Sequence, residues 1–171
     1  MQSPVTFDDA FKVLIGHEGN YTDNPKDPGN WTGGKVGAGV CKGTKYGIAA
    51  NTYPDEDIRN LTLARAKELY KRDYWGKLKM DEVPDVVRFD LFDAAVNSGV
   101  GQAAKFLQRA AGVTDDGAIG PATLAAVKRM DPQLLDKRLS GYRLRFMADL
   151  KVWPDFGRGW ARRIANNLIE D

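Results

Sequence analysis

Acidic side chains are the residues of this 171-residue sequence best suited to acid and base catalysis. One histidine, His17, and one cysteine, Cys41, are too few for the three or four nitrogen and sulfur ligands that zinc sites normally use. The serines are Ser3, Ser98 and Ser140, and a serine triad would have to recruit His17. We therefore expect carboxylates to carry the chemistry, with no metal and no cofactor.

Glu18 is the first candidate. It lies eleven residues after Phe7, so at about 100° per residue it returns to the helix face that carries Phe7, Phe11 and Leu14. A carboxylate at the end of an apolar face is partly desolvated, which raises its pKa. A carboxyl group that stays protonated near neutral pH can protonate a leaving sugar oxygen. The alternative is a surface glutamate that caps a loop.

Asp27 is the second candidate, nine residues after Glu18 in the turn Asp27-Pro28-Gly29. A second carboxylate across a cleft could orient water or stabilise an oxocarbenium-like transition state, and the hydroxyl of Thr32 could share that water. Asp-Pro-Gly is also an ordinary turn formula, so a purely structural role for Asp27 stays open.

A mostly apolar helix over residues 84–98 is predicted to carry Asp90, Asp93 and Asn97 on one face, because their offsets are three and four. Such a helix belongs in the core, where polar groups need partners. Those partners are either polyol ligands in a cleft or other side chains in a buried network. Several aromatic side chains could stack on sugar rings or pack in the core: Tyr21, Trp31, Tyr46, Tyr74 and Trp75.

Apolar spacing and Pro/Gly punctuation predict a mainly α fold. One helix is expected at 7–16, and helices follow almost without interruption from residue 62 to the end. Residues 19–47 contain eight glycines and are expected to form a loop or small hairpin lobe. Long structured loops of this kind are often binding or catalytic segments.

The net charge is +2, but residues 128–163 contain ten Lys or Arg and four Asp. This basic segment is either a solvated helix face or a surface for an anionic partner such as a cell-wall polymer. No motif for nucleic-acid binding accompanies it. The sequence shows no signal-peptide pattern and no window of about 18 apolar residues, so we expect cytoplasmic synthesis and no stable membrane insertion.

Several spaced motifs follow one another along the chain. The first group is His17-Glu18-Gly19-Asn20-Tyr21, Asn24-Pro25-Lys26-Asp27-Pro28-Gly29 and Thr44-Lys45-Tyr46-Gly47-Ile48. Two helical motifs follow, Tyr70-Lys71-Arg72-Asp73-Tyr74-Trp75 and Phe92-Asp93-Ala94-Ala95-Val96-Asn97-Ser98-Gly99. In this order and spacing, these motifs together resemble glycoside hydrolase family 108. The segment 116–124, Asp-Gly-Ala-Ile-Gly-Pro-Ala-Thr-Leu, resembles a peptidoglycan-binding-like unit.

The resemblance implies a lysozyme-like helical body with a catalytic region at 1–111 and a peptidoglycan-binding-like region at 112–171. It implies an N-acetylmuramidase that hydrolyses the β-1,4 bond between N-acetylmuramic acid and N-acetylglucosamine. The family's catalytic glutamate maps onto Glu18. Asn20 replaces a family glycine, and residues 30–43 are longer than the usual link.

The second catalytic group is expected to be Asp27, assisted by a threonine, either Thr44 or Thr32. Substrate-binding residues are expected to be Tyr21, Tyr46, Asp93 and Asn97. The distance between the two carboxyl groups would decide the stereochemistry, since ~5 Å suits retention and ~6.5 to 9.5 Å suits inversion.

Three other functions compete with this interpretation. A lytic transglycosylase would use the sugar's own 6-hydroxyl in place of water. A cysteine peptidase would use Cys41 and His17. A non-catalytic wall-binding or secretion-regulating protein would bind peptidoglycan without cleaving it.

The partner implied by the resemblance is peptidoglycan, met at the cell wall or in the periplasm. Export from the cytoplasm would then need a holin, as for a phage endolysin, or another route in a bacterium. We expect the protein to act as a monomer.

Because the expected chemistry needs no metal, EDTA should leave the rate of cell-wall lysis unchanged. Turbidity loss of purified cell walls with and without the chelator measures this. A loss of activity that added Zn²⁺ or Mg²⁺ restores would contradict catalysis by carboxylates alone.

Overall fold

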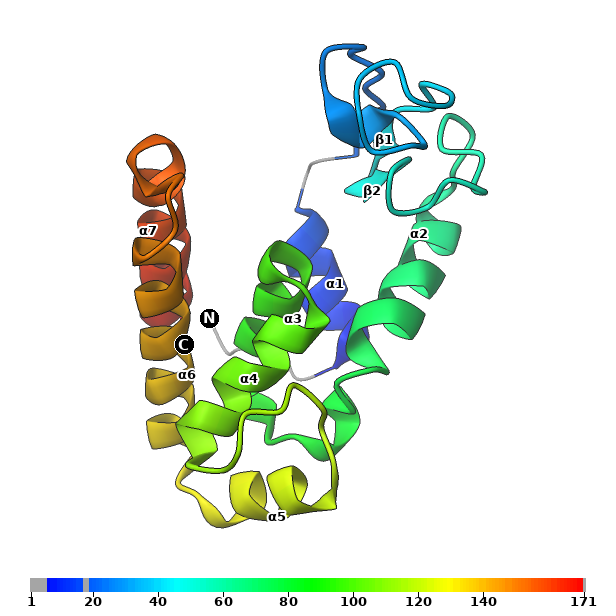
Figure 1. Cartoon of the computed structure of the whole chain (residues 1–171). Coiled ribbons are helices and arrows are strands. Elements are labelled where there is room, and N and C mark those ends of the chain that lie inside the picture. Colours follow the sequence, from blue (N-terminus) through cyan, green and yellow to red (C-terminus); the bar gives the residue numbers. More distant parts are fainter. Residues whose placement is uncertain (1–5, 17–18, 171) are drawn as a thin grey trace. The chain divides into compact units, whose positions relative to one another are not determined.

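The computed structural model describes residues 6–16 and 19–170. Seven α-helices occur within these residues (Figure 1). They are α1 (Phe7–Ile15), α2 (Leu63–Tyr70), α3 (Asp85–Ser98), α4 (Val100–Ala111), α5 (Pro121–Arg129), α6 (Pro132–Ala148) and α7 (Trp153–Glu170). The two short strands β1 (Thr44–Lys45) and β2 (Ile48–Ala49) pair antiparallel. Short helical turns complete the elements: η1 (Pro28–Asn30), η2 (Lys71–Trp75) and η3 (Met80–Glu82).

The prediction of a mainly α, lysozyme-like fold with a Gly-rich lobe near the N-terminus is confirmed. The helix ends follow the expected chemistry. Pro121 and Pro132 occupy the first turns of α5 and α6, where their missing N–H costs nothing. The Asp131 side chain caps α6 by accepting a hydrogen bond from the Leu134 amide at 2.8 Å. Gly112 ends α4 in a left-handed conformation, with φ of 72°.

The chain divides into two structural units, one made of residues 1–10 and 71–171 and the other of residues 11–70. The first unit contains α3 to α7, and the second contains the Gly-rich lobe and α2. These structural units differ from the predicted functional regions, 1–111 for catalysis and 112–171 for peptidoglycan binding, and that functional division stays a prediction. None of the described helices is long and apolar enough to cross a membrane.

In the first unit, α3 is the central helix, packing against α4, α6 and η2. Its buried side chains point in all directions, as expected for a helix that is apolar around most of its circumference. Phe7, Trp75 and Phe92 form a cluster of edge-to-face aromatic pairs with centroids 5.4 to 5.9 Å apart. The Trp75 indole donates to Asp81 at 3.0 Å, which satisfies its polar atom.

The acidic residues of α3 belong to a buried polar network. Asp93 is 1% exposed and pairs with the Arg143 guanidinium of α6 at 2.7 Å. Arg163 of α7 donates from Nε to both Asp93 oxygens, at 2.8 and 3.0 Å. Asn167 of α7 donates to Asp90. Of the two alternatives considered for these carboxylates, the structure shows the network, which ties α3 to α6 and α7.

Burial alone raises the pKa of the Asp93 carboxyl, but the hydrogen bonds and charges of Arg163 and Arg143 outweigh it. The net pKa therefore lies below the ordinary value of 3.8. A carboxyl with a depressed pKa stabilises the fold above its unfolded-state pKa, and this contribution is lost as the pH falls through the folded-state pKa. Asp93 thus contributes to stability at neutral pH and loses that contribution below about pH 4.

Asp93→Asn should lower the free energy of unfolding by about 3 to 5 kcal/mol, because Arg143 would stay buried without its counter-ion. Urea denaturation at pH 7 measures the loss, and the difference from wild type should shrink below pH 4. The control is Asp115→Asn, whose partner is the half-exposed Arg109, and its cost should be much smaller because solvent screens an exposed ion pair. Equal costs for the two variants would contradict a special role for the buried pair.

Candidate functional site

Glu18, the predicted general acid, lies outside the described residues, as does His17. The segment that follows Glu18, beginning at Gly19, and the residues that contact it lie within the unit of residues 11–70.

The segment after Glu18 pairs with the chain around β1. Thr22 and Thr44 form an antiparallel bridge, with N···O distances of 2.9 and 2.8 Å. A Cβ on Gly19 would come within 2.7 Å of the Tyr46 ring, and one on Gly43 within 2.7 Å of the Tyr21 ring. The two glycines therefore let the aromatic rings pack against the backbone. Four motif positions, 19, 21, 44 and 46, are brought together in this way.

The turn between β1 and β2 consists of Tyr46 and Gly47, with φ values of 52° and 74°. Two consecutive positive φ angles are the signature of the tight hairpin turn that matches the twist of the strands. A tyrosine rarely adopts this conformation. Tyr70 holds it in place, because its hydroxyl donates to the Tyr46 carbonyl at 3.1 Å and fills the space beside Gly47.

Asn30 is the central polar residue of the lobe and is 0% exposed. Its side-chain oxygen accepts from the Thr44 hydroxyl at 2.7 Å, and its side-chain nitrogen donates to the Asn24 carbonyl at 3.0 Å. Its own carbonyl accepts from the amides of Lys42 and Gly43 at 2.9 and 3.1 Å. These bonds join the two ends of the loop formed by residues 31–41, which is the extension between the motifs. They bring Thr44 back to the turn that contains Asp27.

Asp27 and Thr32, two of the candidates near the proposed water, have local structural partners. The exposed Asp27 carboxylate caps η1 by accepting from the Gly29 amide at 2.8 Å. The Thr32 hydroxyl accepts from the Val40 amide at 3.0 Å, inside the extension. Thr44, in contrast, pairs with the segment that follows Glu18. Thr44 thus lies with the segment that follows Glu18 and Thr32 lies in the loop of residues 31–41, while catalytic roles for Asp27, Thr32 and Thr44 stay predictions.

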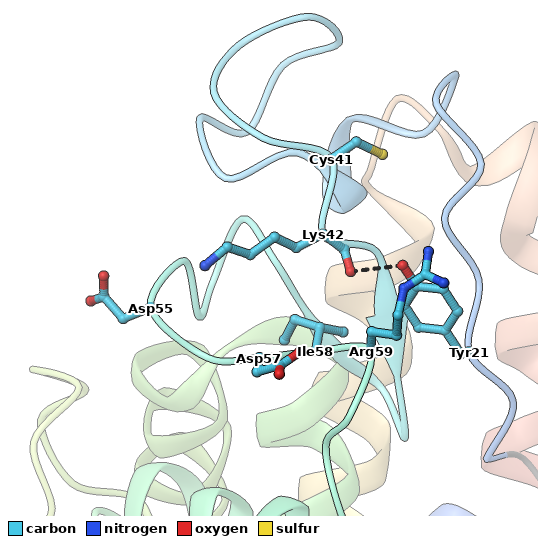
Figure 2. A pocket seen from close by; sticks show the side chains of 7 residues that line it. All are labelled: Tyr21, Cys41, Lys42, Asp55, Asp57, Ile58 and Arg59. Carbon is cyan, nitrogen blue, oxygen red and sulfur yellow. Dashed lines mark hydrogen bonds between the residues drawn. The ribbon is translucent and has the colours of Figure 1, made fainter.

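A pocket of about 320 Å³ lies beside Tyr21 (Figure 2). Its lining consists of Tyr21, Cys41, Lys42, Asp55, Asp57, Ile58 and Arg59. The Arg59 guanidinium lies 4.9 Å from the centre of the Tyr21 ring, and the Tyr21 hydroxyl donates to the Lys42 carbonyl at 3.1 Å. Hydrogen bonds from Asn60 lower the pKa of the Asp57 carboxyl. The pocket thus offers cations, carboxylates and an aromatic ring to a polar ligand.

Of this lining, the sequence singled out Tyr21 and, for the peptidase alternative, Cys41. It did not single out Lys42, Asp55, Asp57, Ile58 and Arg59, or Asn30. Lys42, Asp57 and Arg59 are spread over a segment without helical or strand periodicity, so no pattern predicted their convergence. Asn30 lies next to the Asp-Pro-Gly turn, which is the only local signal that could have drawn attention to it.

The remaining two predicted sugar-binding residues lie on α3. Asp93 is held in the buried network, and Asn97 is exposed in the last turn of the helix. Sugar binding by either residue stays a prediction, and the ion pairs of Asp93 assign it a structural role.

Comparisons with known proteins agree with this architecture. The sequence model of the family described as "Glycosyl hydrolase 108" matches residues 11–99, and the one described as "Predicted Peptidoglycan domain" matches residues 102–165. The structure of Brucella abortus SagA is similar, with 32% sequence identity, coverage of 94% of this chain and 90% of that chain, and a TM-score of 0.79. Comparison with curated proteins gives no match.

The fold and the two matches define a peptidoglycan-degrading glycosyl hydrolase. The chain belongs to glycosyl hydrolase family 108, followed by a peptidoglycan-binding-like domain. The resemblance found from the motifs is thereby confirmed.

Thr44 provides a test of the site that separates folding from catalysis. Thr44→Val leaves the buried Asn30 oxygen without its donor, so the free energy of unfolding should fall by about 1 to 3 kcal/mol. If the hydroxyl also holds the catalytic water, the lytic rate of the folded variant should fall about tenfold or more. Urea denaturation and wall lysis measure the two effects.

Thr44→Ser is the matched control, because it keeps the hydroxyl and should retain both stability and rate. A folded Thr44→Val protein with the wild-type lytic rate would exclude Thr44 from the reaction.

Proposed function

We propose that the protein is an N-acetylmuramidase that hydrolyses the β-1,4 bond between N-acetylmuramic acid and N-acetylglucosamine, with Glu18 as general acid. The observation that supports this most is the pairing of Thr22 with Thr44. It places the chain immediately after Glu18 against a hydroxyl with a fixed orientation and against the Tyr46 ring. Family membership supports the same assignment.

In this mechanism, the Glu18 carboxyl donates its proton to the glycosidic oxygen as the bond from that oxygen to the anomeric carbon breaks. The sugar ring develops oxocarbenium character, which a nearby carboxylate stabilises. Asp27 is the proposed carboxylate, as base or as electrostatic stabiliser. Water adds to the anomeric carbon, and its proton passes to the basic carboxylate, so that charge and atoms balance.

Thr44 would orient the water through a chain of hydrogen bonds. The Asn30 amide nitrogen donates to the Asn24 carbonyl, which directs the amide oxygen toward Thr44. The Thr44 hydroxyl donates to that oxygen, so its lone pairs are free to accept a hydrogen from water. A water held in this way turns its own oxygen lone pairs toward the sugar.

The proposal includes how the enzyme meets its polymer. Tyr21, Tyr46 and Asn97 contact the glycan, and residues 1–111 carry catalysis while residues 112–171 bind the wall. The enzyme acts as a monomer at the cell wall or in the periplasm, which it reaches through a holin or another export route. In a phage, such an enzyme is an endolysin.

Glu18→Gln should reduce the lytic rate by about 10² to 10⁴-fold, because an amide cannot donate the proton that the leaving oxygen needs. Mass spectrometry of digested peptidoglycan should show reducing N-acetylmuramic acid ends for the wild type. Glu82→Gln, an exposed glutamate in η3, is the control and should keep the full rate.

Retention of most of the rate by Glu18→Gln would refute the assignment of the general acid. Anhydro ends in the wild-type products would identify a lytic transglycosylase instead. Sedimentation with walls but no release of reducing sugars would indicate a non-catalytic binding protein.

A further inference from the structure

A second pocket, of about 340 Å³, lies in the unit of residues 71–171 and within the peptidoglycan-binding-like domain. Tyr142, Arg145, Phe146 and Asp149 line it from α6 and its C-terminal cap, and Arg109 lines it from the last turn of α4. The four α6 positions are spaced by three, one and three residues, which places them on one face of the helix. Helices α4 and α6 pack against each other, so the pocket has a fixed frame.

Two of the lining side chains are held by neighbours, and one cation is available. Arg109 pairs with Asp115 at 2.6 Å. The Phe146 ring packs edge-to-face on the buried Phe106, with centroids 5.4 Å apart. Arg145 is exposed, so its guanidinium is accessible to a ligand. The pocket therefore presents a planar cation beside two aromatic rings, with a carboxylate one helical turn further along.

The charges of the pocket discriminate between the two parts of peptidoglycan. The N-acetylated glycan is uncharged where the lactyl groups of its muramic acid are amide-linked to peptide, so an arginine has no ionic partner on it. The stem peptides carry free carboxylates and, at their diamino acid, an ammonium group. A guanidinium binds a carboxylate through two parallel hydrogen bonds, and a carboxylate binds an ammonium.

We propose that this pocket binds the peptide stem of peptidoglycan, with Arg145 pairing with a stem carboxylate. Tyr142 and Phe146 pack on the aliphatic part of the peptide, and Asp149 accepts from its ammonium or amide groups. The site adds a second point of attachment to the polymer that the catalytic region cleaves, which raises retention on intact walls without a new contact at the reaction centre. It deepens the proposed function, because the substrate is peptidoglycan in both.

The test is an NMR titration of the full chain with a free stem peptide, compared with the same peptide after amidation of its carboxyl groups. Arg145→Gln should weaken binding of the free-carboxylate peptide about tenfold or more. It should leave binding of the amidated peptide unchanged, since the lost interaction is with the carboxylate. The two ligands and two proteins form a cycle that isolates this one contact.

Arg158→Gln is the matched control, because it removes the same charge from an exposed position of α7 outside the pocket. It should bind both peptides like the wild type. The proposal is overturned if Arg145→Gln binds the free-carboxylate peptide like the wild type, if both arginine variants lose the same affinity, or if the wild type shows no binding at millimolar peptide. Circular dichroism confirms that the variants are folded.

The stem peptide has no glycosidic bond, so this result does not depend on the muramidase assignment. An active Glu18→Gln enzyme would refute the general acid and leave the peptide site intact. Loss of peptide binding in Arg145→Gln together with unchanged product chemistry would support the site by itself.

Discussion

The buried amide of Asn30 is the interaction on which the arrangement of the lobe depends. An amide in the interior costs about 1 to 3 kcal/mol for each group left without a partner, so only a backbone arrangement that satisfies it is stable. In this lobe the satisfied arrangement joins Asn24, Lys42, Gly43 and Thr44 at one point. The segment after Glu18 is bound to that point through Thr22. The lobe has little regular secondary structure, and these hydrogen bonds contribute to its local order together with buried apolar side chains such as Ile48 and Ile58.

The helical unit has a comparable polar constraint in Asp93. Replacing a buried ion pair by apolar residues is often neutral, so the pair between Asp93 and Arg143 is weak evidence for stability in itself. Its value is in specification, because a carboxylate that is 1% exposed tolerates only a packing that brings both arginines to it. Three helices, α3, α6 and α7, supply the carboxylate and its two arginine partners, so the network joins all three.

The helices were predictable from the sequence because their signals are local. Apolar spacing with a period of 3.6, and proline or glycine at the ends, act within one segment, and α1 and α3 appear where those signals place them. The polar contacts were not predictable, since Asp93 meets partners 50 and 70 residues further along the chain. The two-residue strands β1 and β2 are too short to show alternation. The family could be predicted from motif spacing, but the contact between Thr44 and Asn30 depends on the closed loop between them, which no local signal predicts.

That closed loop explains how the chain accommodates an extension between its motifs. The ordering cost of a loop grows only with the logarithm of its length, and each doubling adds about 0.6 kcal/mol. What matters for the site is where the loop begins and ends, and both ends are fixed at the same residue by the Asn30 carbonyl. Trp31 and Cys41 form an antiparallel bridge next to this point, and residues 32–40 between them form a separate hairpin-like loop. The separation of Asp27 and Thr44 in the sequence therefore does not set their separation in space.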